Sequence, residues 1–256
     1  MRILFIGDIF GNPGRRIAAR YLAAHAGQFD LVIANGENAT AGRGLSRKHF
    51  EELRGLGIDL ITLGNHTWDQ REAIELVEET PRLLRAANYP PGTPGLELSV
   101  IESAAGERLA VAQLLGRVFM EPMDDPFAKA ESLLEMVPEG VPLLVDIHAE
   151  ATSEKRVLGW QLRGQAAAVV GTHTHVQTAD EMLVDGTAYI TDVGMTGIQD
   201  SAIGMGYDEV HYRFTRHMPK RFKPADEGRA ALCGVILETS GARCTAIERI
   251  NWSADE

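Results

Sequence analysis

Cysteine is scarce in this sequence, and long apolar runs are missing from it. Only two cysteines occur among 256 residues, Cys233 and Cys244, without a CxxC pair or a neighbouring histidine cluster. Neither a thiolate metal site nor a disulfide framework is therefore expected. No stretch approaches the ~20 apolar residues that cross a bilayer, and the N-terminal apolar run is broken at Asp8 with no cleavage pattern after it. We expect a cytoplasmic protein whose cysteines are buried and reduced.

Positive charge is also in short supply. Lys and Arg total 25 against 36 Asp and Glu, which gives a formal net charge of −11. Such a balance repels polyanions, so neither bulk nucleic-acid binding nor an anionic membrane partner is expected. Residues 211–223 are an exception, because they combine Lys and Arg with aromatic residues and contain no acid. This basic segment is either a surface insertion or a lid whose cations and rings hold phosphate and base.

The abundant residues describe a globular α/β protein. Hydrophobic residues make up 45% of the chain and charged residues 24%, as in ordinary soluble domains. Short runs rich in β-branched residues alternate with segments of helical period, which favours an α/β fold. The predicted strands are residues 2–7, 30–35, 58–64, 108–115, 142–148 and 166–171. The length is compatible with one domain over residues 1–256, which we prefer because no linker or repeat is visible.

Helix and turn signals fill the intervals between these strands. One helix is predicted with Pro13 near its start and Ile17, Tyr21 and Leu22 on one face. Others are predicted over 46–53, over 69–79 and from Asp125 to about Val137. Residues 184–187 form a predicted hairpin turn, and residues 230–238 and 243–250 a closing antiparallel pair. The sheet arrangement should therefore be mixed.

Side chains that can bind metal follow the predicted strands. They are Asp8, Glu37, Asn38, Asn65, His66, His148, His173 and His175. Because ligands bind beyond the carboxyl ends of strands in open α/β sheets, these segments can converge on one site. A mixed oxygen and nitrogen set suits manganese, iron or zinc. Without His66 the set still has seven members, which are too many ligands for one ion. Two ions that share one carboxylate would use all seven, and two such ions can clamp a phosphoryl group.

Each residue alone has an ordinary explanation as well. Asp8 could cap a helix, Asn38 could sit in a turn, and His148 could be a core histidine. The glycine-rich stretch at 7–15 matches neither dinucleotide nor P-loop spacing. An HxH pair at 173–175 also occurs in amidohydrolases, but there it follows an early strand and here it comes late. The ordered set is therefore the informative feature.

In their order along the chain, these motifs resemble the calcineurin-like metallophosphoesterases. The series reads Gly7-Asp8-Ile9-Phe10, Gly36-Glu37-Asn38, Gly64-Asn65-His66, a lone His148 and Gly171-Thr172-His173-Thr174-His175. Phe10 stands where that family has His, Glu37 where it has Asp, and one residue is inserted between Gly171 and His173. With these departures the chain is similar to the YmdB-like subfamily. That resemblance implies an α/β sandwich of two mixed β-sheets flanked by helices (αββα), a dinuclear metal centre, and phosphodiesterase activity on small nucleotides such as 2′,3′-cyclic ones.

The resemblance and the residue chemistry together predict a role for each side chain. One ion would be held by Asp8, Asn38 and His175, the other by Asn65, His148 and His173, with Glu37 across both. A metal-bridging hydroxide would attack phosphorus in line, and His66 would protonate the leaving ribose oxygen as general acid. Iron or manganese is the expected metal, with zinc as a further candidate.

Two other functions remain open at this point. One is a phosphomonoesterase or 5′-nucleotidase with the same dinuclear site, because the motifs define the metals and not the leaving group. The other is a metal-binding regulatory protein with little turnover. A small nucleotide phosphodiester is the expected binding partner. Homo-oligomerisation is expected on general grounds, with no motif behind it.

Overall fold

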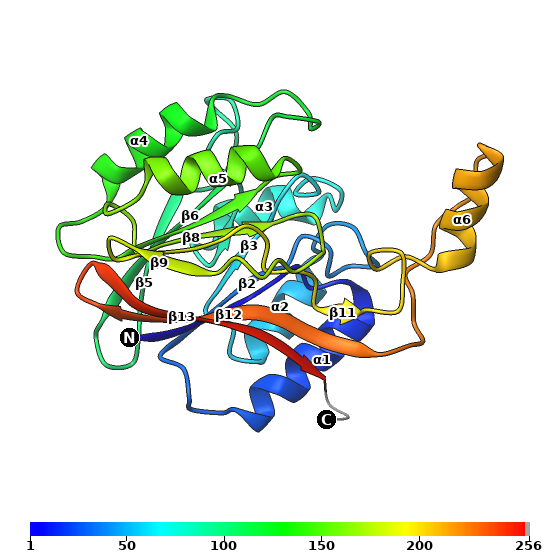
Figure 1. The fold of residues 1–256 in the computed structure, drawn as a ribbon, viewed down its shortest axis with the longest axis horizontal. Helices are drawn as coiled ribbons and strands as arrows, with labels where there is room; N and C mark the ends of the chain where they lie inside the picture. The colour runs from blue at the N-terminus through cyan, green and yellow to red at the C-terminus, as the bar shows by residue number, and fades with distance from the viewer. Residues whose placement is uncertain (254–256) are drawn as a thin grey trace.

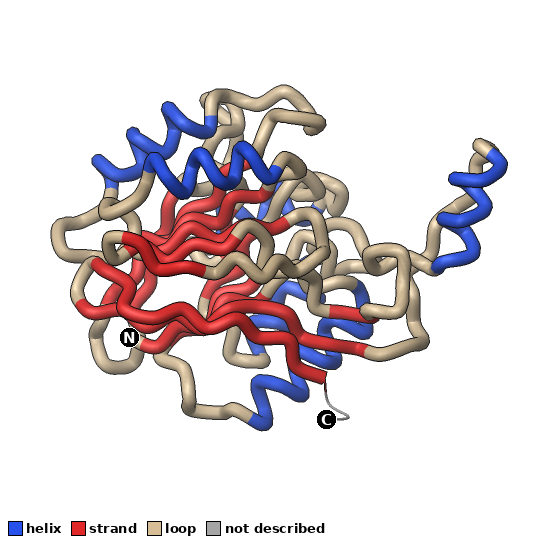
Figure 2. The backbone as a smooth tube through the Cα atoms, viewed as in Figure 1, coloured by secondary structure: helices blue, strands red, loops and turns tan. Residues whose placement is uncertain are grey.

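Two mixed β-sheets stack face to face between two layers of helices (Figures 1 and 2). The structure, a computed structural model, describes residues 1–253. The helices are α1 (Gly11–Ala24), α2 (Arg47–Gly55), α3 (Glu72–Glu79), α4 (Pro126–Met136), α5 (Thr152–Gln161) and α6 (Tyr207–Arg216). The strands are β1 (Arg2–Ile6), β2 (Leu31–Asn35), β3 (Leu60–Thr62), β4 (Leu83–Leu84), β5 (Leu98–Glu102), β6 (Arg108–Leu115), β7 (Leu143–His148), β8 (Ala168–Thr172), β9 (Met182–Val184), β10 (Thr187–Ile190), β11 (Gly197–Ile198), β12 (Ala230–Ser240) and β13 (Arg243–Ser253).

Both sheets have parallel strands at the centre, with antiparallel strands at one edge of the first sheet and at both edges of the second. The first sheet runs β11-β12-β1-β2-β3-β4, with β13 also paired to β12. In it β1 to β4 are parallel, and β12 is antiparallel to β1. The second sheet runs β5-β6-β7-β8-β10-β9, with β6, β7, β8 and β10 parallel. The predicted αββα sandwich of two mixed sheets is therefore confirmed.

Alternation of apolar side chains along the strands builds three core layers. In β1, Ile3 and Phe5 pack between the sheets, whereas Leu4 and Ile6 pack against the helices of the first sheet. A third cluster joins the outer face of the second sheet to α4 and α5. Strands buried on both faces appear as continuous apolar runs, which is why the composition of these segments predicts them.

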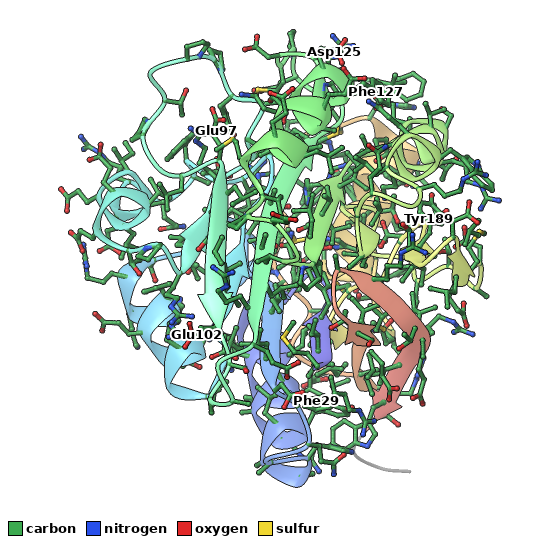
Figure 3. All side chains as sticks on the ribbon, turned by 90° about the vertical axis from the view of Figure 1, so that its left-hand side faces the viewer. Phe29, Glu97, Glu102, Asp125, Phe127 and Tyr189 are labelled. Atoms are coloured by element: carbon green, nitrogen blue, oxygen red, sulfur yellow. The ribbon has the colours of Figure 1, made fainter. Side chains whose placement is uncertain are left out.

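Local signals in the sequence explain several boundaries. Asp125 accepts hydrogen bonds from the backbone of Phe127 and Ala128 and caps α4, with Pro126 in the first turn (Figure 3). The β9–β10 hairpin turns through Asp185 and Gly186, both with positive φ (53° and 81°), as a two-residue hairpin requires. The closing pair β12–β13 is also present as predicted.

Helix α6 extends away from the two-sheet body (Figure 1). In the described chain it contributes no buried residue, and Phe214 is 71% exposed. This helix, α5 and β5 are not among the predicted elements. Both cysteines are buried, as expected. Within residues 1–253, no helix combines the length and apolarity needed to cross a membrane.

Candidate metal centre

The seven predicted ligands meet at the carboxyl ends of β1, β2, β3, β7 and β8. Glu37, His148 and His173 each offer a metal-binding atom, and these atoms lie within 4.8 Å of one another. Asp8, Asn38 and Asn65 contact members of this trio, and His175 contacts Asp8 and Asn38. Strands from both sheets therefore contribute to a single cluster, as predicted from their sequence positions.

Asp8, Asn38 and His175 form the first part of the cluster. Asp8 is fully buried, and its Oδ2 accepts a hydrogen bond from the backbone of His173 (3.2 Å). Its Oδ1 lies 3.7 Å from Nε2 of His175 and has no hydrogen-bond partner in residues 1–253. The carboxamide nitrogen of Asn38 lies 3.2 Å from the same Nε2. Since Nδ1 of His175 donates to the carbonyl of Ile203 (2.8 Å), Nε2 is the atom presented to the cluster.

Asn65, His148 and His173 form the second part. Nε2 of the fully buried His148 lies 2.9 Å from Oδ1 of Asn65 and 3.1 Å from Nδ1 of His173. Nε2 of His173 lies 3.1 Å from Glu150, a residue that no motif in the sequence singles out. These contacts leave the histidine nitrogens and the Asn65 oxygen facing one small volume.

Glu37 connects the two parts. Its Oε1 lies 3.0 Å from Nε2 of His148 and accepts a hydrogen bond from Asn38 (3.2 Å), while Oε2 accepts one from the backbone of His66 (2.9 Å). A Cβ at Gly64 would come within 2.2 Å of Oε2 and 2.6 Å of Nε2 of His148. Only glycine at position 64 leaves room for this arrangement.

Burial and mutual contact shift the pKa values of four residues in the cluster. Burial opposes ionisation of Glu37, but contact with His148 outweighs it and lowers the pKa of Glu37 to about 2. Burial likewise opposes charging of His148, yet Glu37 and Asp8 raise its pKa to about 9. Burial raises the pKa of Asp8 to about 6. Burial, together with the His148 charge, lowers the pKa of His173 to about 3.

These observations fit a site for metal ions. A buried carboxylate oxygen without a partner costs free energy unless a cation or donor meets it, and Asp8 Oδ1 is such an atom within the described residues. Carboxylate, carboxamide and imidazole donors are the set preferred by manganese, iron and zinc. Asp8 does not cap α1, whose N-cap residue is Phe10, so the helix-cap explanation does not account for its burial.

Backbone strain is concentrated at two of the predicted ligands. His173 and His175 have φ values of 98° and 65°, a region that residues with a Cβ rarely occupy. Between them, Thr174 donates to Asp192 through its backbone nitrogen (3.1 Å) and its hydroxyl (2.8 Å). Asp192 in turn pairs with the fully buried Lys155 (2.7 Å). Strain of this kind persists where the surroundings enforce it and is common at functional sites.

His66 lies beside the cluster with a partner that its motif does not reveal. Its Nδ1 lies 3.0 Å from Oδ2 of Asp69, three residues further on, and its side chain is 22% exposed. The i, i+3 spacing is the available sequence signal for this pair. Phe10, which cannot bind metal, packs edge-to-face on His175 with ring centroids 5.5 Å apart.

An open cleft of ≈ 960 Å³ lies over the cluster. His66, His173 and His175 line it together with part of the basic segment, namely Arg213, Phe214, Lys220, Arg221 and Phe222. Part of this segment is the C-terminal half of α6, and cation–π contacts join it to the residues that follow, with Arg213 5.2 Å from the ring of Phe222. The segment therefore faces the same space as the predicted metal ligands.

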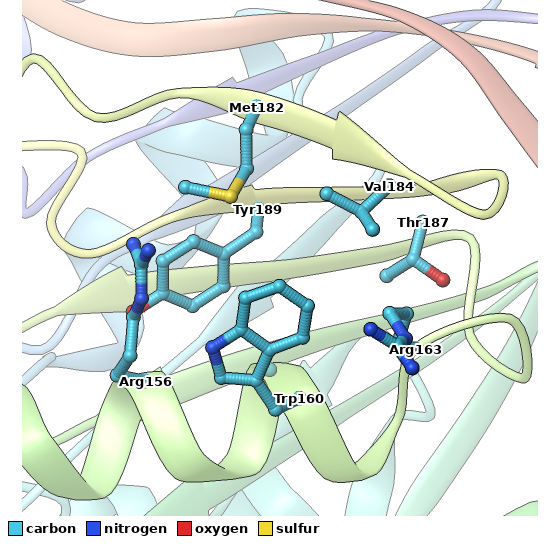
Figure 4. Close-up of a pocket in the computed structure, with 8 residues that line it drawn as sticks. Arg156, Trp160, Arg163, Met182, Val184, Thr187 and Tyr189 are labelled. Carbon is cyan, nitrogen blue, oxygen red and sulfur yellow. The ribbon is translucent and has the colours of Figure 1, made fainter.

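A second hollow lies between α5 and the β9–β10 hairpin (Figure 4). Arg156 lies over the rings of Trp160 and Tyr189, 5.8 Å and 5.5 Å from their centroids, and pairs with Asp180 (3.4 Å). This hollow shares no lining residue with the large cleft.

Two mixed sheets between helices, with metal-capable side chains gathered at their strand ends, define a fold of the metallophosphoesterase type. A family model described as "YmdB-like protein" matches residues 4–250. The chain belongs to the YmdB-like family, which confirms the resemblance seen in its motifs.

Individual relatives agree over nearly the full length. The chain is 47% identical to the 2′,3′-cyclic-nucleotide 2′-phosphodiesterase of Bacillus subtilis (strain 168), covering 98% of this chain and 96% of that one. A solved structure of a hypothetical protein from Thermus thermophilus superposes with a TM-score of 0.94 at 45% identity, covering 99% of each chain. A Mycoplasma pneumoniae protein described as a novel phosphatase has a TM-score of 0.92 at 33% identity, covering 99% of this chain and 93% of that one.

Proposed function

We propose that this protein is a metal-dependent phosphodiesterase that hydrolyses small nucleotides, 2′,3′-cyclic nucleotides among them. The observation that carries the proposal is the gathering of seven metal-capable side chains, three of them in one tight group and four in contact with it or with one another, under a cleft lined by cations and aromatic rings. The activity named for the Bacillus subtilis relative supports the same substrate class.

Two metal ions, iron or manganese with zinc as a further candidate, fit the two parts of the cluster. Asp8, Asn38 and His175 would hold one ion, Asn65, His148 and His173 the other, and Glu37 would contact both. Bound there, two ions supply positive charge for the phosphoryl oxygens and make a nucleophile available at neutral pH. The loop at 173–175, in which His173 and His175 have positive φ and Thr174 is bound by Asp192, keeps two of the imidazoles in place.

His66 provides the proton for the leaving ribose oxygen. Asp69 accepts from Nδ1 and fixes the orientation of the ring, which leaves Nε2 as the atom available for proton transfer. An alkoxide leaving group needs such a proton, whereas a nitrophenolate does not. His66→Asn should therefore slow hydrolysis of 2′,3′-cyclic AMP by about 10²- to 10⁴-fold and leave hydrolysis of bis(4-nitrophenyl) phosphate nearly unchanged. Equal losses on both substrates would contradict the general-acid role.

The basic segment binds the phosphate and the base of the substrate. Arg213 lines the cleft, whereas Arg216, one turn further along α6, does not. This difference supplies a matched pair of charge reversals in one helix. Arg213→Glu should raise KM for 2′,3′-cyclic AMP about tenfold or more, as expected for loss of a charge-assisted contact, and Arg216→Glu should change it little. An unchanged KM in Arg213→Glu would show that the segment is not a lid over the substrate.

Phosphomonoester hydrolysis is the second candidate function. The description of the Mycoplasma pneumoniae structure as a phosphatase favours it. Comparing kcat/KM for a nucleoside monophosphate and for 2′,3′-cyclic AMP on one metal-loaded preparation decides between the two. A larger value for the cyclic diester supports the phosphodiesterase.

A further inference from the structure

Thr172 is the residue inserted between Gly171 and His173, and the site described so far gives it no role. It ends β8, is fully buried, and pairs in register with His148 at the end of β7. Its hydroxyl lies 2.9 Å from Nδ1 of His148 and 2.6 Å from Oδ1 of Asp146. One side chain therefore links a predicted metal ligand to a buried carboxylate.

The environment of Asp146 determines where the hydroxyl proton goes. Its Oδ2 is approached by Thr62 Oγ1 (2.7 Å), Gln113 Nε2 (2.8 Å) and Asn35 Nδ2 (3.3 Å). All three groups are donors, so Oδ2 acts as an acceptor, and the Thr172 hydroxyl donates to the other carboxylate oxygen, Oδ1. The single hydroxyl proton of Thr172 then points to Oδ1.

The direction of the hydrogen bond from Thr172 determines the tautomer of His148. With its proton committed to Asp146, the Thr172 oxygen is an acceptor toward the imidazole, so Nδ1 of His148 must carry hydrogen. Nε2, the nitrogen that lies among Glu37, Asn65 and His173, is then the one whose lone pair can bind a metal.

We propose that Thr172 is a positioning residue which, with Asp146, keeps hydrogen on Nδ1 of His148 and so reserves Nε2 for the metal. The inference rests on the proposed function only in taking His148 as a metal ligand. This role explains the inserted residue at 172, because a residue without a hydroxyl at this register position could not link Asp146 to His148.

Four variants test the chain of hydrogen bonds. Thr172→Ser keeps the hydroxyl and should bind Zn²⁺ as the parent does, whereas Thr172→Val should bind it about 10- to 100-fold more weakly, as loss of an outer-shell partner does elsewhere. Asp146→Asn should weaken binding similarly, because its amide group would donate to Thr172 and turn the hydroxyl proton toward His148. Thr62→Val is the matched control: it removes a buried hydroxyl from the same carboxylate without touching His148 and leaves two donors on Oδ2, so its Zn²⁺ affinity should stay close to that of the parent.

The direct readouts are calorimetric Zn²⁺ affinity and long-range ¹⁵N–¹H correlation of the histidines in the Zn²⁺-loaded protein. We expect a protonated Nδ1 and a metal-bound Nε2 for His148 in the parent and in Thr172→Ser. A His148 that carries hydrogen on Nε2 in the parent overturns the inference without any variant, and so does parental Zn²⁺ affinity in Thr172→Val. A parent that has the expected His148 spectrum but hydrolyses no diester would instead contradict the proposed function alone.

Discussion

Replacing Lys155 with methionine should destabilise the protein strongly, because it would leave the charge of Asp192 buried without its counter-ion. Both side chains are almost inaccessible, at 0% and 1% exposure, and their charged atoms lie 2.7 Å apart. Removing one partner of such a pair costs about 3–5 kcal/mol. Asp192 keeps hydrogen bonds from Thr174 and from the backbone of Gly194 (2.8 Å), so we expect the lower end, about 3 kcal/mol.

Urea unfolding followed by circular dichroism measures this loss, with the same m-value required in parent and variant. Lys129→Met is the control, because its partner Glu97 forms a pair that is partly exposed (23% and 32%) and should be worth about 0–1 kcal/mol. Adding Asp192→Asn to Lys155→Met should restore part of the stability. A loss below about 1 kcal/mol in Lys155→Met would refute the reasoning that this buried pair stabilises the loop carrying His173 and His175.

Titration of two buried groups, His148 and Cys233, leads to three further predictions. In the presence of chelator, the free energy of unfolding should fall as pH rises from 6.5 through about 9, because the folded chain holds the proton of His148 more tightly than the unfolded chain does. Because His148 is protonated at pH 7 in the metal-free protein, metal binding at this pH should release a proton, which calorimetry in buffers of different ionisation enthalpy measures. A metal affinity that is independent of pH between 6.5 and 8.5 would contradict this prediction. Burial raises the pKa of Cys233 to about 12, so its thiol should resist a disulfide reagent at pH 8 until urea unfolds the chain; rapid labelling of the folded protein would contradict this.

The central strands and the site residues could be predicted because each has a local signature. Strands such as β6 and β7 are buried on both faces and appear as apolar runs, and metal-capable side chains directly after such runs must lie near one sheet edge. The N-cap at Asp125 depends on two adjacent residues and is equally visible in the sequence.

Other elements lack such a signature. Helix α6 has three apolar side chains at helical spacing, Tyr207, Val210 and Phe214, but over only ten residues and with none of them buried, so the pattern does not mark it as a core helix. Helix α5 buries the charged Glu154 and Lys155 on its inner face, so this face does not appear as an apolar stripe in the sequence. Strand β5 alternates between buried and exposed positions over only five residues.

The hydrogen-bond and ion-pair partners of the site residues could not be predicted from the sequence either. Asp146 and Thr172 belong to different strands, and only the register of β7 against β8 brings them to 2.6 Å. The contact between His173 and Glu150 likewise depends on how two loops approach each other. Such contacts depend on tertiary geometry that motif spacing does not encode.

Under the proposed function, Glu37 contacts both ions of a dinuclear centre that hydrolyses a phosphodiester. Steady-state hydrolysis of 2′,3′-cyclic AMP and of an aryl phosphodiester by the manganese-loaded protein, with Glu37→Gln in parallel, tests it most directly. Glutamine keeps the size of the side chain and removes the charge shared between the two parts of the cluster. We expect turnover of both diesters by the parent and a loss of at least about 100-fold in the variant. No turnover of either diester by a parent that binds two metals, or parental activity in Glu37→Gln, would contradict it.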